Sequence, residues 1–502
     1  MLVFLLKLSL LGVLLFCAYL VWILIRNRLD PLAKTVPGFD CSNPLFGNLP
    51  FGPEAEAKTC FQRWAEYNKR FGRIYRYYGI LGHRWVAVSD PEEVRRICIT
   101  DARHFKRGPL HGVSSFIRVV GETSMLVTAG EVHKKHRTLA SSAFKLSSLK
   151  LIHPTMLEIV QAHLAHWRSI TPSVGEGLVV NTRKDMSRLA LTIIGRCGFG
   201  FDFQCMGGKS SPMADALEAI IGMEQPIRIW YLFPGASYIP AKRLRQVNAG
   251  LSQMQEMFVK MVGAKASSTE GQKDILSVIM SGDMERAPEQ RLSASELRDQ
   301  MMTFIMAGHE TTRHPLPLLF HLLSYTHSPA AWPSTTPSTY SLNTLRLRSA
   351  VAASYEQLDM LPFSRAVVYE ALRLYPIIPM FPRTNLTEQR VGGFDFPAGT
   401  AFAIHVATMH RLPDVWDRPN DFVPERFLEE KVPWEAWMPF GEGQHKCLGY
   451  KLALSEMVMT VALILRTFHV ELSEESPKSL RHQIFVSLQP KDRLNLRIRR
   501  LI

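Results

Sequence analysis

Acidic residues are missing from one long stretch of this chain, which has 502 residues in all. Between Thr311 and Tyr355 there is no aspartate or glutamate. Within that stretch the run from Ser328 to Ser349 is rich in turn-forming residues and is typical of a loop. Pro315 and Pro317 stand near its start. Because a proline ring clashes with the carbonyl four residues back, we expect any helix that reaches Thr311 to kink there.

Cysteine is scarce, with seven residues that are scattered and contain no CxxC pair. An odd, scattered set argues against a disulfide framework and against a zinc site, and it is typical of proteins from a reducing compartment. The chain also has no Gly/Ser-rich linker and no internal repeat at which it could be divided. We therefore expect one large domain rather than several small ones.

Acidic residues are also the minority charge, with 45 against 59 lysines and arginines, so that the formal net charge is +14. The basic residues are dispersed along the chain and form no stripe, which argues against nucleic-acid binding. A membrane surface and an acidic protein partner account better for the sign of the charge.

Charged residues are absent from the run between Leu8 and Ile25, which is strongly apolar. As a helix it would rise about 27 Å, against roughly 30 Å for the hydrocarbon core of a bilayer. Arg26 and Arg28 follow it and favour a cytosolic side for the rest of the chain. No convincing signal-peptide cleavage site follows the run. We expect residues 1–28 to be a membrane anchor and residues 29–50, which contain several prolines, to be a stiff connector.

One short segment contains the most specific chemistry, the run FGEGQHKCLG from Phe440 to Gly449. Gly441 and Gly443 permit the positive φ angles of a tight turn. Cys447 lies just before an apolar helical run, whose free N–H groups would hold its sulfur ionised. Such a thiolate is able to serve as an axial ligand of heme iron. The alternative from the residues alone is a buried structural cysteine.

A second motif, MMTFIMAGHETT, runs from Met301 to Thr312. Ser293 and Glu296 form a capping box ahead of it, and its apolar residues recur at helical spacing, so we predict a long helix. Glu310 and Thr311 place an acid beside a hydroxyl in an apolar stretch, where each needs a hydrogen-bond partner. The residues alone also allow a helix that turns this polar side to solvent.

A third motif places Glu370 and Arg373 on one face of a helix. The segment PERF, from Pro424 to Phe427, offers Arg426 as a second cation for the same carboxylate. A buried acid between two guanidiniums would be a structural ion network rather than a catalytic group.

The order of AGHETT, ExxR, PERF and FxxGxxxCxG closely resembles the cytochrome P450 family of heme-thiolate monooxygenases, over nearly the whole chain. The resemblance implies the mainly α fold of that family with a small β-rich region, here preceded by an N-terminal transmembrane helix. It implies a catalytic domain over residues 51–502 and a heme b (iron protoporphyrin IX) with Cys447 as its axial ligand. By the same resemblance Glu310 and Thr311 would relay protons during oxygen activation.

The resemblance also implies further cofactor contacts. They are His133 and Arg137, one helical turn apart, Arg383, His445 and Phe440. The first four would bind the heme propionates, which are anions and need cationic or hydrogen-bonding partners. At His445 the family more often has arginine, so that its contact would be weaker or pH dependent. Phe440 would cover the sulfur of Cys447.

The function implied is insertion of one atom of dioxygen into a lipophilic organic substrate, in secondary (terpenoid-like) or lipid metabolism. Electrons would come from an NADPH-dependent flavoprotein reductase that docks near Lys446 and Lys451. The location implied is the endoplasmic reticulum membrane, with a single-pass anchor and the catalytic domain facing the cytosol. By family position, residues 109–125 and 484–488 would line the substrate pocket.

Two alternatives remain at the level of the sequence. One is a heme-thiolate isomerase or peroxygenase, which needs no reductase. The other is a non-catalytic heme- or lipid-binding protein, impaired by the segment 313–354, where the family usually has charged amphipathic helices.

Elsewhere the patterns predict a β-hairpin around Gly82, a helix at PEEVRRICI, further helices at 187–197, 214–223 and 241–262, and strands within 392–404.

Overall fold

A computed structural model describes residues 2–41, 43–48, 60–108, 117, 119–172, 177–208, 211–221, 242–266, 274–326, 354–477, 480–484 and 487–501. The chain forms two compact units. Unit 1 contains residues 1–109, 378–421 and 433–446, and unit 2 contains residues 110–377, 422–432 and 447–502.

Unit 1 is built on a five-stranded sheet with the strand order β1-β2-β8-β5-β3. Its strands are β1 (Ile74–Tyr78), β2 (Arg84–Val88), β3 (Phe105–Arg107), β5 (Phe381–Asn385) and β8 (Ala401–Ile404). The strands β1 and β2 are antiparallel, so the hairpin predicted around Gly82 is confirmed. Strand β8 runs parallel to β2, which joins the early hairpin to a segment far along the chain. The hairpin of β6 (Gln389–Val391) and β7 (Phe394–Phe396) precedes β8.

The helices of unit 1 are α1 (Leu2–Arg28), α2 (Leu32–Thr35), α4 (Cys60–Phe71), α5 (Pro91–Arg95) and α18 (Val406–Met409). The end of α1 packs on the β1–β2 turn, where Asn27 donates a hydrogen bond to the carbonyl of Gly82 over 3.0 Å and Ile23 is fully buried. Among the described residues no helix has both the length and the apolar character needed to cross a membrane. The anchor at residues 1–28, the connector and the domain at 51–502 stay predictions.

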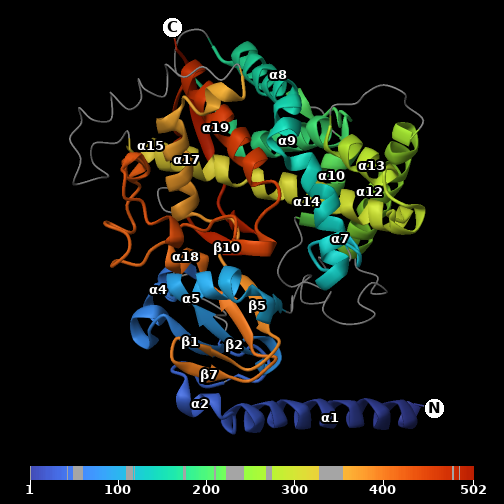
Figure 1. The fold of residues 1–502 in the computed structure, drawn as a ribbon, viewed down its shortest axis with the longest axis vertical. Helices are drawn as coiled ribbons and strands as arrows, with labels where there is room; N and C mark the ends of the chain where they lie inside the picture. The colour runs from blue at the N-terminus through green and yellow to red at the C-terminus, as the bar shows by residue number, and fades with distance from the viewer. Residues whose placement is uncertain are drawn as a thin grey trace. The chain divides into compact units, whose positions relative to one another are not determined.

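Unit 2 is mainly helical. Its longer helices are α7 (Gly130–Ser141), α8 (Leu146–Ile170), α9 (Thr182–Ile193), α10 (Pro212–Ile221), α12 (Lys242–Ala266), α13 (Ile275–Met284), α14 (Ala294–Thr312), α15 (Pro315–Thr326), α17 (Pro362–Leu374) and α19 (Tyr450–Thr467). Helix α14 contacts α9, α12, α15 and α19, and Figure 1 shows it below α9. Nearly every residue of α14 from Asp299 onward is buried, because the helix is covered on most of its sides.

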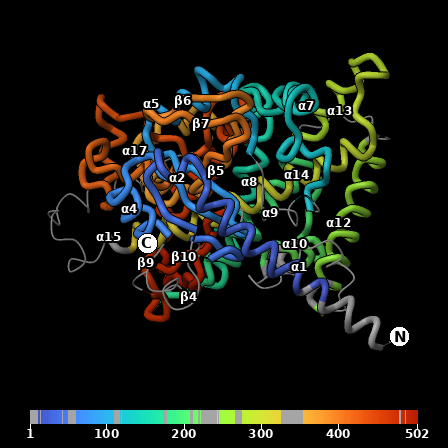
Figure 2. Tube along the Cα trace, turned by 90° about the horizontal axis from the view of Figure 1, so that it is seen from below, coloured from blue at the N-terminus to red at the C-terminus, as the bar shows by residue number. Residues whose placement is uncertain are grey.

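Two small sheets complete unit 2. One has the order β4-β12-β9, from β4 (Leu178–Asn181), β12 (Asn495–Arg500) and β9 (Phe468–Leu472). The other is the hairpin of β10 (His482–Ile484) and β11 (Leu488–Pro490). Figure 2 shows the C-terminus beside β9, with which β12 pairs. The predicted fold class, mainly α with a small β-rich part, is confirmed for the described chain.

Helix α14 begins and ends close to where its sequence predicts. Both halves of the capping box are formed, because Ser293 accepts from the backbone of Glu296 and Glu296 accepts from the backbone of Ser293. The predicted long helix is thus confirmed, and it ends at Thr312. A new helix begins at Pro315, which supports the interruption expected there. The predicted loop at 328–349 lies outside the described residues.

Candidate functional site

The residues predicted to form the site are divided between the two units. Unit 2 contains His133, Arg137, Glu310, Thr311, Glu370, Arg373, Arg426 and Cys447, and unit 1 contains Arg383, Phe440 and His445.

Cys447 is exposed and lies directly ahead of α19, whose N-cap is Gly449. Among the described residues no side chain caps this helix end, and the positive end of the helix dipole therefore lies close to Cys447. A Cβ atom at Gly449 would lie 3.4 Å from the ring of Phe144, and that ring is 5.9 Å from the ring of Phe304 on α14. Two aromatic rings therefore connect the turn after the cysteine to α14.

Helix α7 presents His133 and Arg137, with His133 buried and Arg137 half-buried. Burial lowers the pKa of Arg137, and the negative charge of Cys447 partly offsets this effect. The guanidinium is thus within electrostatic reach of the sulfur. Unit 2 accordingly places the Arg137 cation where it would favour a negative charge on Cys447.

Arg383 on β5 is a buried cation, with a side chain that is only 6% exposed. It donates to the carbonyl of Pro382 over 2.9 Å and stacks on the ring of Phe381 at 4.6 Å. Burial lowers its pKa. Among the described residues no carboxylate lies within ion-pairing distance of it. A buried guanidinium with neutral partners only is suited to an anionic ligand, such as a heme propionate.

The loop before Cys447 has the conformation expected from its glycines. Gly441 and Gly443 have φ angles of +66° and +71°. A Cβ atom at Gly443 would lie 1.9 Å from the carbonyl oxygen of Cys98, so no side chain fits there. The positive φ angles predicted for this turn are confirmed.

His445 and Phe440 have partners within unit 1. The Nδ1 atom of His445 lies 3.3 Å from a guanidinium nitrogen of Arg107 on β3. The ring of Phe440 makes an edge contact with Trp437 at 6.4 Å. Arg107 was not predicted from the sequence, and no local pattern marks it. It places a permanent cation beside the position where the family more often has arginine.

On α14, three residues keep some exposure within an otherwise buried stretch, namely Ala307, Gly308 and Thr311. They lie on one face, and the hydroxyl of Thr311 donates to the carbonyl of Ala307 over 2.6 Å. A Cβ atom at Gly308 would lie 2.8 Å from Ile194, so this glycine allows close packing of α14. Between Asp299 and Thr312, the Ala307–Thr311 face is the part of α14 that protein atoms leave partly uncovered.

Glu310, one residue before Thr311, is buried. Its carboxylate accepts from Arg313 at 2.9 Å, from Ser487 at 2.8 Å and from Gln489 at 2.6 Å, and it lies 3.3 Å from His314. Burial alone would raise the pKa of Glu310, but the charge of Arg313 and the contact with His314 bring it well below the usual range. The carboxylate is therefore ionised, and both of its oxygens accept hydrogen bonds. Its predicted part in proton relay stays a prediction.

The structure brings Glu370, Arg373 and Arg426 together. Arg373 binds both carboxylate oxygens of Glu370, at 2.7 and 2.8 Å, and Arg426 binds one at 3.1 Å. The backbone N–H of Val423 adds a bond of 2.8 Å. Glu370 and Arg373 have no exposed surface, so the carboxylate joins α17 to the PERF segment from the interior.

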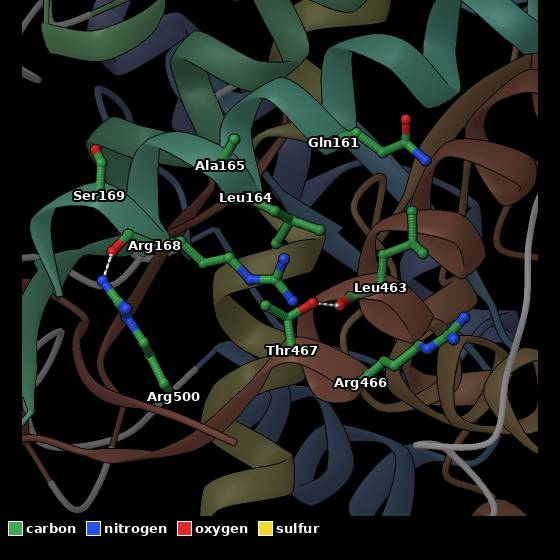
Figure 3. A pocket seen from close by; sticks show the side chains of 9 residues that line it. All are labelled: Gln161, Leu164, Ala165, Arg168, Ser169, Leu463, Arg466, Thr467 and Arg500. Atoms are coloured by element: carbon green, nitrogen blue, oxygen red, sulfur yellow. Dashed lines mark hydrogen bonds between the residues drawn. The ribbon is translucent and has the colours of Figure 1, made fainter. Parts of the chain in front are cut away.

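A groove of about 670 Å³ lies elsewhere in unit 2, between the ends of α8 and α19 and strand β12 (Figure 3). Arg168 and Arg466 are the basic residues in the last turns of these two helices, and Arg500 donates to the backbone carbonyl of Arg168. Cations at helix C-termini offset the helix dipole. The arginines of this groove are therefore explained by their place at the ends of two helices. None of the predicted site residues lines the groove.

Comparisons with known proteins show which family the chain resembles. The family model described as Cytochrome P450 matches residues 36–496. Cytochrome P450 monooxygenase 124 of Postia placenta is 26% identical, over 77% of this chain and 76% of that protein. Lithocholate 6-beta-hydroxylase of Mesocricetus auratus is 25% identical, over 88% of this chain and 86% of that protein. Bifunctional cytochrome P450/NADPH--P450 reductase 2 of Bacillus subtilis is 26% identical over 92% of this chain, which spans 42% of that protein.

Proposed function

The chain belongs to the cytochrome P450 family, and on this premise we propose that it inserts one atom of dioxygen into a lipophilic organic substrate. Family membership makes it an oxidoreductase, a cytochrome P450 monooxygenase with heme b as its cofactor and a redox partner as its source of electrons. When bound, heme supplies the binding and activation of dioxygen. The lipophilic substrate, its place in terpenoid-like or lipid metabolism and the NADPH-dependent flavoprotein reductase are our proposals.

The observation that carries the proposal is the position of Cys447 at the uncapped start of α19. We propose that its sulfur is the axial ligand of the heme iron, because the helix N-terminus favours the thiolate. Phe440 is proposed to cover the sulfur. His133, Arg137, Arg383 and His445 are proposed to bind the propionates. The buried Arg383 without a carboxylate partner among the described residues supports this assignment most directly.

Thr311 is proposed to hold a proton for the oxygen reaction at its hydroxyl, which lies on the partly uncovered face of α14. The hydroxyl now donates to the carbonyl of Ala307, so it is oriented and can accept a further hydrogen bond. Proton relay by Glu310 would require its carboxylate to leave Arg313, Ser487 and Gln489. The network of Glu370, Arg373 and Arg426 is proposed to hold the segment before the cysteine loop in place.

The test uses the full-length protein with added hemin. After reduction and addition of carbon monoxide we expect the strongly red-shifted Soret band of a thiolate-ligated heme, and its loss in Cys447→Ala. NADPH consumption and product formation with a supplied flavoprotein reductase then test the monooxygenase reaction. Product formed without any reductase would favour the isomerase or peroxygenase alternative. Heme binding without any turnover would favour the non-catalytic alternative that depends on the 313–354 segment.

The membrane location is a separate proposal. We propose a single-pass anchor at residues 1–28 in the endoplasmic reticulum membrane, with the catalytic part in the cytosol. The exposed apolar side chains of α1, among them Leu14, Leu15, Phe16 and Trp22, support it. Full-length protein should stay with membranes after alkaline extraction, whereas a chain that begins at Leu29 should be released. Equal release of both forms would refute the anchor.

A further inference from the structure

The C-terminal hairpin β10–β11 is joined to the oxygen-side helix α14 through a single carboxylate. Ser487 and Gln489 come from the hairpin and both bind the same oxygen of Glu310, at 2.8 and 2.6 Å. All three side chains are buried, with exposures of 6% or less. The contact joins segments that are far apart in the sequence.

The geometry leaves the carboxylate no freedom to move. Arg313, three residues further along the chain, binds the other carboxylate oxygen of Glu310 at 2.9 Å. If the carboxylate swung away, these donor atoms of Arg313, Ser487 and Gln489 would lose their buried acceptor, which is unfavourable. The pKa of Glu310 lies far below its usual range, so at neutral pH the carboxylate is ionised and accepts hydrogen bonds from all these donors.

The hairpin is short, and an ion pair of 2.6 Å between Arg481 and Asp492 closes its open end. It has three paired positions, from His482–Pro490 to Ile484–Leu488. Isolated two-stranded hairpins of this size are marginally stable. A backbone bond of 2.7 Å from Leu488 to the carbonyl of Ile377 helps to hold it. The bonds to Glu310 add a charged anchor at the end of the turn.

We propose that Glu310 is a positioning residue, which fixes the β10–β11 hairpin against α14 and thereby sets the wall that substrate contacts. This inference rests on the proposed function, because the substrate contact of residues 484–488 is expected from the family resemblance. In this chain Arg313 and His314 hold the carboxylate in that role. Glu310 acts on substrate through Ser487 and Gln489, which it holds from α14.

The test compares Glu310→Gln, Ser487→Ala and Gln489→Ala in the heme-loaded, full-length protein. Glu296→Gln is the matched control, because it makes the same change on α14 but its carboxylate binds Lys135 and His136 instead of the hairpin. Two optical titrations are used as probes. Imidazole is small and reports the iron site, whereas clotrimazole is bulky and also reports the walls of the pocket.

We expect Glu310→Gln, Ser487→Ala and Gln489→Ala each to weaken clotrimazole binding about tenfold, the effect of losing one buried hydrogen bond to a charged group. Imidazole binding should remain unchanged. Amide hydrogen exchange in 480–491 should become faster in the same variants and remain unchanged in Glu296→Gln.

Wild-type clotrimazole affinity and exchange in Ser487→Ala and Gln489→Ala would overturn the proposal, even if Glu310→Gln fails to fold. Loss of product with a large solvent isotope effect in Glu310→Gln, but with an unchanged hairpin, would restore the proton-donor role. The exchange measurement needs no turnover, so it separates this inference from the proposed function.

Discussion

Single residues show how strongly local surroundings decide the state of a carboxyl group. Glu310 and Glu456 are both buried, on α14 and α19 respectively. Glu310 has a cation and hydrogen-bond donors and is ionised. In the part of the chain that the structure describes, no cation acts on Glu456. Burial raises its pKa to about 8, an effect that a hydrogen bond with Thr312 only partly opposes. One of its oxygens has no partner among the described residues. Glu456 is thus a neutral acid at pH 7.

The neutral state of Glu456 makes stability depend on pH. The folded protein keeps this proton up to about pH 8, whereas the unfolded chain loses it near pH 4.5. Between these values the folded state binds more protons, so stability from this group falls as pH rises. Glu456→Gln removes this pH dependence. The part removed amounts to about 1.4 kcal/mol of unfolding free energy for each unit by which the folded and unfolded pKa values differ. We expect the thermal midpoint of the variant to match wild type near pH 5 and to exceed it near pH 8. Parallel pH profiles would contradict this prediction.

Gly443 is the residue in the cysteine loop that tolerates no side chain. Gly443→Ala combines a positive φ angle with a clash at the carbonyl of Cys98. We expect a loss of about 2 kcal/mol or more, seen as lower heme content and a weaker thiolate Soret band. Gly399→Ala is the control, because its φ of +82° is similar but open space surrounds its Cβ position. Equal effects of both substitutions would show that the φ angle and not the contact is responsible.

At the scale of elements, the break between α14 and α15 is less disruptive than its two prolines suggest. Helix α15 begins at Pro315, so that Pro315 and Pro317 both lie in its first turn. N–H groups in a first turn have no partner within the helix, so proline removes no hydrogen bond there. The interruption is therefore a helix boundary that follows directly after the Thr311 face.

This boundary can be tested by substitution. Pro315→Ala and Pro317→Ala should change the free energy of unfolding by less than about 1 kcal/mol, because neither restores a helical bond. Phe320→Pro, in the interior of α15, should cost about 3 kcal/mol or more. Thermal midpoints of the heme-loaded proteins measure both. A large stabilisation by Pro315→Ala would mean that α14 continues through this position.

Most contacts between elements that are far apart in the sequence were beyond prediction, and the ion pair of Glu370 with Arg426 is the exception. The capping box of α14, the glycine turn and the helix after Cys447 depend on spacings of a few residues, and they formed as expected. The bonds of Ser487 and Gln489 to Glu310, and the contact of Arg107 with His445, join segments that no local pattern connects. The predicted pairing of Glu370 with Arg373 is local, whereas its partner Arg426 was inferred from the order of family motifs.

For the whole molecule, charge is the property that the sequence states most directly. A net charge of +14 favours encounter with an acidic redox partner, and such encounters weaken as salt rises. Lys451 is exposed at the start of α19, whereas Lys446 is paired with Glu442 at 2.6 Å. Lys451 therefore offers the more available charge for docking.

We expect reduction of the heme by a flavoprotein reductase to slow several-fold as salt rises from about 0.05 to about 0.5 M. Lys451→Glu should slow it at low salt and flatten its salt dependence. Lys260→Glu, which makes the same charge change at an exposed position of α12, should follow the wild-type curve. Stopped-flow reduction rates under carbon monoxide measure all three. Identical curves for Lys451→Glu and wild type would place the docking surface elsewhere.

The sequence by itself determined the family, the fold class and the cysteine that we assign to iron, because these depend on residue types at short, fixed spacings and on the order of four motifs. Only the tertiary structure decided what surrounds each charged group. It placed Glu310 among buried donors and Arg383 away from any described carboxylate. The state of a charged side chain is set by the atoms within a few ångströms of it, and those atoms come from parts of the chain that folding alone brings together.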